Sequence, residues 1–179
     1  MDKYELGLDA IPANFEALTP LSFLPRSAAV YPDHVAMIHG DWTYTYSEFF
    51  ERAKRLASAL EKRGIGKGDT VSVMAPNIPA LWEAHFGVPV TGAVLNALNT
   101  RLDAETIAFI LDHGECKILF TDREHSDVIA HAVKIANVDP IVIDIDDPGA
   151  TSGELIGEMD YEAFQIGRAS CRERVSPYV

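Results

Sequence analysis

The stretch KGDTVSVMAPNIPALWEAHFGVPVTGAVLNALNTRLDAETIAFILDHGECKILFTD, Lys67–Asp122, decides the fold of this chain. Its aliphatic runs TVSVM and CKILF have the composition of buried strands. Between them, Asp103 is placed to cap a helix whose Ile107 and Leu111 share one face, and Gly114 is placed to end it. This alternation of strand and helix predicts an α/β fold with a mainly parallel sheet and flanking helices.

The residues before this stretch predict a hairpin and a long helix. The hairpin turn is His39-Gly40-Asp41, which lies between runs of β-forming residues. Thr45 and Glu48 have the spacing of a capping box. The helix that they begin has one apolar stripe, made of Phe49, Ala53, Leu56, Ala57 and Leu60. The following GIGKGD ends a helix and leads into a strand, which is the reverse of the order in a phosphate-binding loop.

The residues after Asp122 first continue the alternation of strand and helix and then depart from that pattern. EHSDVIAHAVKIAN is typical of a helix and PIVIDID of another buried strand. Residues 147–165 form a polar, glycine-bearing connection. We expect no further element there, although such a connection in an open α/β sheet normally leads to one.

Composition excludes several classes of protein. The chain has 179 residues, of which 47% are hydrophobic and 23% charged, as in an ordinary globular domain. Its net charge of -12 opposes binding to nucleic acid. No apolar run is long enough for a membrane span, and the acidic start differs from a signal peptide. Cys116 and Cys171 form no metal-type pair, which favours a reducing, cytoplasmic setting.

Arg101 is the candidate binding residue. It is the one Lys or Arg between Lys67 and Lys117, and it lies between an expected strand end and a helix cap. Ligands of open α/β sheets gather at the carboxyl ends of strands, and a guanidinium matches phosphate or carboxylate oxygens. The alternative is an ion pair with Asp103 or Glu105.

The histidines predict no metal site. His125 and His131 are six residues apart, so they do not share a helical face, and no HExxH pattern occurs. His85 is either a pocket residue or a buried histidine bonded to the backbone.

The order of these segments resembles the beginning of adenylate-forming enzymes, in particular the acyl-CoA synthetases. The resemblance covers about residues 20–145. It rests on WTYTYSEF, a strand closing on Pro76-Asn77, the pair Gly92-Ala93 and the N-x-R-L of Asn99–Leu102. Residues 1–165 would then be an incomplete first part of the large N-terminal, AMP-binding domain.

The resemblance implies an ATP-dependent carboxylic acid–CoA ligase of the kind used in fatty acid metabolism. In this family an acid and ATP give an acyl-adenylate with magnesium, and the thiol of coenzyme A then displaces AMP. Arg101 matches the arginine of N-x-R-L, which implies a contact with a coenzyme A phosphate. The resemblance implies that the family's phosphate loop, acid pocket and lid lysine lie beyond this chain. We therefore assign no catalytic or metal residue and expect the chain alone to be inactive.

Three alternatives stay open. The chain could instead be a free-standing, non-catalytic binding or scaffold domain, or belong to an amino-acid-adenylating or a light-emitting relative. A fragment would expose apolar sheet surface and could self-associate. Residues 166–179, IGRASCRERVSPYV, hold Arg168, Arg172 and Arg174 against Glu173. Their first ten letters, IGRASCRERV, resemble a translated sequencing-adapter oligonucleotide, and the alternative is a real, solvated basic tail. We therefore expect this segment to be a foreign or disordered tail.

Overall fold

The computed structural model describes residues 19–166 together with Gly7, Ile11 and Phe15. The helices are α1 (Phe23–Val30), α2 (Tyr46–Lys62), α3 (Pro79–Gly87), α4 (Ala104–His113), α5 (Ser126–Ile135) and α6 (Tyr161–Ile166). The short 3-10 turns are η1 (Pro20–Ser22), η2 (Pro89–Thr91) and η3 (Arg123–His125). The strands are β1 (Val35–His39), β2 (Trp42–Thr45), β3 (Thr70–Met74), β4 (Val94–Ala97), β5 (Cys116–Asp122), β6 (Ile141–Ile145) and β7 (Met159–Asp160).

The main sheet is parallel throughout, as the sequence predicts. Its strand order is β4-β3-β5-β6-β7, and Val71 of β3 lies opposite Leu95 of β4 and Ile118 of β5. The chain leaves β3 for β4 on one side and later returns to place β5 on the other side. The strand order therefore reverses between β3 and β5, and their carboxyl ends form the topological switch point of the sheet.

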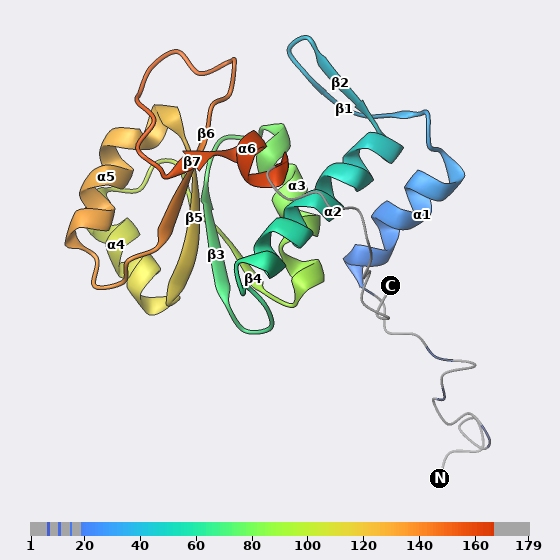
Figure 1. Cartoon of the computed structure of the whole chain (residues 1–179), viewed down its shortest axis with the longest axis horizontal. Helices are drawn as coiled ribbons and strands as arrows, with labels where there is room; N and C mark the ends of the chain where they lie inside the picture. Colours follow the sequence, from blue (N-terminus) through green and yellow to red (C-terminus); the bar gives the residue numbers. More distant parts are fainter. Residues whose placement is uncertain (1–6, 8–10, 12–14, 16–18, 167–179) are drawn as a thin grey trace.

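Helices cover both faces of the sheet. Figure 1 shows α2, α3 and α6 against one face and α4 and α5 against the other. The first face buries Leu56 and Leu60 of α2, and the second buries Ile107 and Leu111 of α4. All five residues of the predicted apolar stripe on α2 are buried, with Leu56 fully inaccessible.

The long helix begins and ends where the sequence predicts. Thr45 accepts the backbone N–H of Glu48, and the Glu48 carboxylate accepts the N–H of Thr45, so both bonds of the capping box form. Gly64, at φ +79°, follows the last turn in the left-handed conformation that favours glycine. The GIGKGD segment is a helix end and a turn, in which Asp69 accepts the N–H of Gly66 before β3 begins.

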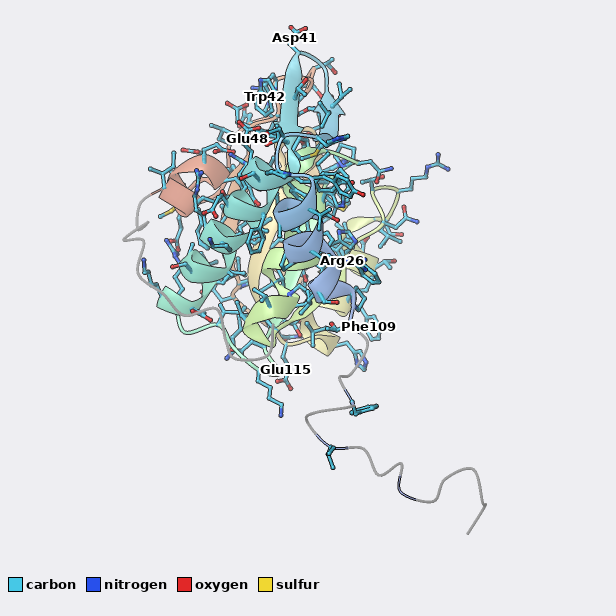
Figure 2. All side chains as sticks on the ribbon, turned by 90° about the vertical axis from the view of Figure 1, so that its right-hand side faces the viewer. Arg26, Asp41, Trp42, Glu48, Phe109 and Glu115 are labelled. Carbon is cyan, nitrogen blue, oxygen red and sulfur yellow. The ribbon has the colours of Figure 1, made fainter. Side chains whose placement is uncertain are left out.

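The predicted hairpin forms and projects from the body of the molecule. Strands β1 and β2 pair antiparallel around the Gly40 turn, and Met37 packs into a small cluster with α1 and α2. Figure 2 shows Asp41 and Trp42 at the outer end of this hairpin. Val35 and Ile38 are 52% and 72% exposed, so the hairpin presents apolar side chains to its surroundings.

Residues 147–165 differ from the expectation of a connection with no further elements. After a loop, β7 pairs parallel with β6, and α6 follows it. The carboxylate of Asp144 accepts the N–H groups of Ile156 and Gly157, which returns the loop to the sheet beside β6. Two apolar contacts then hold α6, whose Tyr161 and Phe164 lie edge-on to Phe120 of β5. The short β7 and α6 were missed because neither is long enough to show a period.

Two further predictions concern the chain as a whole. Ile166 is the last residue of α6, and residues 167–179 lie outside the described part, so the foreign-tail interpretation stays a prediction. Across the described residues, no helix combines the length and the apolar character needed to cross a bilayer.

Candidate functional site

Arg101 lies where the sequence predicts, in the turn between β4 and α4 at the carboxyl edge of the sheet. Leu98 directly follows β4 and is buried, with its N–H donating to the carbonyl of Val73 at 2.8 Å. Leu102 packs partly buried against the core under α4. Arg101 itself is exposed between these two anchors, so its guanidinium points away from the core on a fixed stretch of backbone.

The alternative of an ion pair at Arg101 is not realised among the described residues. The carboxylate of Asp103 instead accepts the N–H of Thr106 at 2.8 Å and caps α4, and this bond lowers the pKa of Asp103 below its ordinary value. Within the described part of the chain, the Arg101 guanidinium has neither an ion-pair nor a hydrogen-bond partner. An arginine held in this way can accept an external anion without first breaking a contact.

The other half of the carboxyl edge is closed by residues 146–157. Arg123, which directly follows β5, pairs with Asp146 at 3.0 Å and donates to the carbonyl of Ala150 at 3.0 Å. Glu124 accepts the N–H of Thr151 at 2.8 Å. We call this segment the strap. Because the strap covers the ends of β5 and β6, the open part of the edge lies at β3 and β4.

Asp122 shows how thoroughly the strap closes this half. It ends β5 at the switch point and is 1% exposed. One carboxylate oxygen accepts the N–H of Glu124 at 2.8 Å, while the other has no partner among the described residues. Burial raises the pKa of Asp122 above its ordinary value. The burial of this carboxyl group leaves it inaccessible to a ligand at the edge.

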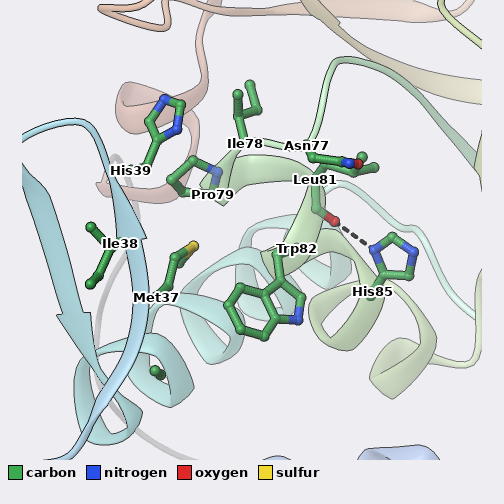
Figure 3. Close-up of a pocket in the computed structure, with 10 residues that line it drawn as sticks. Met37, Ile38, His39, Asn77, Ile78, Pro79, Leu81, Trp82 and His85 are labelled. Carbon is green, nitrogen blue, oxygen red and sulfur yellow. Dashed lines mark hydrogen bonds between the residues drawn. The ribbon is translucent and has the colours of Figure 1, made fainter.

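A pocket of about 430 Å³ lies between the hairpin and α3. Figure 3 shows Met37 and Ile38 of β1 on one side and Trp82 and His85 of α3 on the other. His85 therefore lines a pocket, and it also bonds to the backbone, because its Nδ1 donates to the carbonyl of Leu81 at 2.8 Å. Of the two alternatives from the sequence, the pocket position is confirmed, whereas the buried histidine is wrong, because His85 is exposed although it bonds to the backbone.

The rim of this pocket is fixed by a long-range contact. His39 Nε2 lies 2.8 Å from a carboxylate oxygen of Asp147, which joins the tip of the hairpin to the beginning of the strap. Asp147 is buried, and its second oxygen accepts the N–H of Gly149 at 3.1 Å. The pocket is otherwise lined mainly by apolar side chains, so it offers shape and apolar contact beside the imidazoles of His39 and His85.

Sequence reasoning missed a buried polar cluster that lies between α2, α3 and α6. Glu83 of α3 is inaccessible to solvent and accepts three hydrogen bonds, from Arg52 Nε at 2.5 Å, Tyr161 at 2.8 Å and Gln165 at 2.7 Å. The guanidinium of Arg52 also pairs with both oxygens of Glu162. This cluster joins α2, α3 and α6, which gives it a structural role.

The charges of this cluster stabilise one another. Burial by itself lowers the pKa of Arg52, but the hydrogen bonds with Glu162 and Glu83 outweigh burial and raise that pKa above its ordinary value. Burial and the neighbouring Glu83 raise the pKa of Tyr161 well above its ordinary value. The signal in the sequence was Glu83 itself, a lone carboxylate in the apolar helix IPALWEAHFG, which requires a buried partner.

The described residues supply no metal centre. Across residues 19–166 and the three described residues before them, no group of three His, Cys, Asp or Glu side chains converges as a metal ion requires. His125 and His131 therefore do not form part of such a group.

Comparison with known proteins identifies the family. The sequence model of the AMP-binding enzyme family matches residues 24–171 of the chain. This chain belongs to the AMP-binding enzyme family. Its relatives within that family include the peroxisomal acetate/butyrate–CoA ligase of Arabidopsis thaliana, which is 54% identical over 117 residues, or 65% of this chain. The peroxisomal butyrate–CoA ligase of the same plant is 43% identical over 157 residues, or 85% of this chain.

Solved structures share the fold of this chain. A benzoate CoA ligase from Burkholderia xenovorans superposes with a TM-score of 0.71 at 22% identity, over 83% of this chain and 28% of that structure. At this identity the likeness is one of fold. The chain spans 21% and 27% of the length of the two plant relatives. The described residues therefore form part of the fold of such enzymes, with the parallel sheet and flanking helices that the sequence predicts.

Proposed function

We propose that this chain forms the first part of an ATP-dependent carboxylic acid–CoA ligase, which converts an acid, ATP and coenzyme A into acyl-CoA, AMP and pyrophosphate. Relatives at 54% and 43% identity carry the names of acetate/butyrate and butyrate–CoA ligases, which supports the reaction class. The observation that carries the proposal is the unpaired guanidinium of Arg101 at the open carboxyl edge.

In this proposal Arg101 binds a phosphate group of coenzyme A. Its guanidinium offers a planar fork of donors that matches two phosphate oxygens, and its charge opposes that of the phosphate. The chain is acidic overall, with a net charge of -12, so an anionic ligand needs such a local cation to approach this edge. Arg101 is therefore a binding residue for coenzyme A and takes no part in bond making.

ATP and magnesium belong to the proposal for the whole enzyme. Magnesium offsets phosphate charge when it is bound with ATP. Because no metal-holding group converges among the described residues, we assign no step of the reaction to magnesium through this chain. We likewise assign no ATP contact, because the GIGKGD segment is a helix end and turn.

The acid and the compartment are the finer parts of the proposal. The named relatives act on short acids, so acetate and butyrate are the first substrates to test.

We propose the cytoplasm as the compartment. The support is the cysteine usage of the sequence, whose two cysteines, Cys116 and Cys171, form no metal-type pair and suggest no disulfide framework. Microscopy of a fluorescent fusion of the whole enzyme would check it, and a peroxisomal signal would contradict it.

The reaction class is tested with the chain alone and with a chimera. The chimera replaces the matching segment of the Arabidopsis acetate/butyrate–CoA ligase with this chain. We expect ATP–pyrophosphate exchange at background for the chain alone and acyl-CoA formation from acetate or butyrate for the chimera. Exchange by the chain alone would contradict the inactive-fragment expectation, and a folded chimera without acyl-CoA formation would contradict the ligase proposal.

The role of Arg101 is tested in the same chimera. Replacing Arg101 with alanine removes a charge-assisted phosphate contact, so we expect KM for coenzyme A to rise about 10- to 100-fold. Arg26→Ala is the matched control, because Arg26 is an exposed arginine on α1. An unchanged KM for coenzyme A in Arg101→Ala would show that the assignment is wrong.

Self-association of the chain also belongs to the proposal. The exposed Val35, Ile38 and Trp42 of the hairpin support binding of a hydrophobic dye and concentration-dependent association. Light scattering after gel filtration measures the mass, and Ile38→Lys should reduce both signals. A compact monomer that binds no dye and melts cooperatively would favour the free-standing scaffold domain instead.

A further inference from the structure

We propose that Asn99 is a positioning residue for Arg101, which holds the backbone of that arginine in place at the open edge. The inference rests on the proposed function, because it takes a phosphate group as the ligand of Arg101. It adds a residue whose role is to orient the binding group rather than to touch the ligand.

The contacts of Asn99 form a closed turn around Arg101. The side-chain oxygen of Asn99 accepts the N–H of Arg101 at 3.0 Å, and the main-chain carbonyl of Asn99 accepts the N–H of Leu102 at 3.2 Å. The first bond is that of an Asx turn, in which an asparagine side chain replaces a backbone acceptor. Both bonds end within the four residues Asn99–Leu102, so the turn is local and self-contained.

The turn is anchored on both sides by the fold. Leu98, directly before it, is 6% exposed and bonded to β3, while Leu102 packs against the core under α4. Asp103 then caps α4 through Thr106. Because both ends are fixed, the bond from the Asn99 side chain restrains the conformation of Thr100 and Arg101.

The surroundings agree with a positioning role. Asn99 is exposed, so its amide contributes little to core stability, and its side-chain oxygen accepts the backbone N–H of Arg101. An aspartate could accept the same N–H but would place a negative charge near the anion that Arg101 is proposed to bind. Asparagine provides the same bond without that charge. A residue that orients a binding group lowers the entropy lost when the ligand binds.

The ligand test uses the whole chain and adenosine 3′,5′-bisphosphate as the probe, with NMR detection of the Arg101 amide and guanidinium. We expect Arg101→Ala to weaken binding at least about 10-fold. Asn99→Ala should weaken it about 3- to 10-fold, because one hydrogen bond that orders the arginine is lost. Asn99→Ser should recover part of the loss, since a hydroxyl can close the same turn more weakly. Thr100→Ala is the matched control and should leave the affinity unchanged.

A double-mutant cycle separates positioning from a general structural effect. In the Arg101→Ala background, Asn99→Ala should cause no further loss of affinity, because the group that it positions is absent. An additional loss would show that Asn99 binds the probe directly or that the variant is misfolded, and either result would overturn the inference. A thermal melt of each variant identifies misfolding.

Failure of the inference can be told apart from failure of the proposed function. If Arg101→Ala leaves the affinity unchanged, or the wild-type chain does not bind the probe, the phosphate contact is wrong. If Arg101→Ala weakens binding and Asn99→Ala does not, only the positioning role is wrong. Hydrogen exchange gives a check without ligand: the Arg101 amide should exchange about 10-fold faster or more in Asn99→Ala, while Thr100→Ala leaves it unchanged.

Discussion

Two arginines of this chain lie in opposite surroundings. Arg52 is 9% exposed and is enclosed by Glu83, by Glu162 and by the ring of Tyr44, whose centroid lies 5.2 Å from the guanidinium carbon. Arg101 is exposed, and its guanidinium has no partner among the described residues. The first joins helices of the fold, whereas the second is fixed only through its backbone. The same side chain thus serves structure where its charge is satisfied, and it stays available for the proposed ligand where its charge has no partner among the described residues.

The largest expected effect comes from breaking the Arg52 cluster. Replacing Arg52 with alanine leaves the carboxylate of Glu83 buried without its cation, so we expect a loss of about 3–5 kcal/mol in the free energy of unfolding. Urea unfolding followed by circular dichroism measures it. Arg55→Ala, on the same helix, is the control and should change stability by about 0.5 kcal/mol or less. A loss below about 1 kcal/mol for Arg52→Ala would contradict a structural role.

A smaller effect is expected from opening the strap. Gly153 has φ +89°, and a Cβ there would meet the carbonyl oxygen of Arg123. Gly153→Ala should therefore cost about 2–4 kcal/mol, the sum of left-handed strain and overpacking. Gly64→Ala is the matched control: Gly64 also has positive φ but open space around its Cα, so about 1–2 kcal/mol is expected. Equal losses in the two variants would show that the strap is not tightly docked.

Asp112 tests whether an exposed charge can also serve structure. Its carboxylate accepts the N–H of Val138 at 2.9 Å and two N–H groups of Asn137, and these bonds lower the pKa of Asp112. Because the folded pKa lies below the unfolded one, the stabilisation is present above the unfolded pKa of about 3.9 and is lost as pH falls through the folded pKa.

The measurement for Asp112 is unfolding at pH 6 and pH 3. Asp112→Ala should be less stable than the wild type at pH 6, by less than either variant above, and the difference should shrink at pH 3. Asp112→Asn keeps an uncharged acceptor and should show the smaller loss at pH 6. A difference that is constant with pH would exclude the carboxylate as its source.

The smallest change in stability is expected at Arg101. Arg101→Ala should alter the free energy of unfolding by about 0.5 kcal/mol or less, because the guanidinium is exposed and has no hydrogen-bond or ion-pair partner among the described residues. Urea unfolding and the titration with adenosine 3′,5′-bisphosphate, done on one sample, give the free energy of unfolding and the affinity for the probe. A loss of stability similar to that of Arg52→Ala would show that Arg101 also has a structural role and would contradict the comparison.

The sequence predicts what is local and periodic in this molecule. The aliphatic runs around Val71 and Ile118 predict the parallel strands, and Thr45 with Glu48 predicts the start of α2, all of which the structure confirms. Arg101 could be found because it stands alone between a strand and a cap. Its role at a coenzyme A phosphate rests on the resemblance and stays a prediction.

What the sequence does not predict depends on residues far apart in the chain. Arg52 and Glu162 are 110 residues apart, and no local pattern connects them. Helix α6 has six residues, too few to form alone, so it exists because Phe120 and Glu83 hold it. The strap likewise depends on Asp144 and Glu124, whose side chains bind backbone groups that a sequence pattern does not reveal.

The buried position of Glu83 has a consequence for synthesis on the ribosome. Gln165, one of its donors, follows 82 residues later, and Tyr161 follows 78 residues later. At roughly 5–20 residues per second, the ribosome needs roughly 4–16 s to deliver them. During that interval α3 has emerged with a carboxylate whose partners from α6 do not yet exist. The α2–α3 face of the sheet therefore reaches its final packing only after α6 has been synthesised.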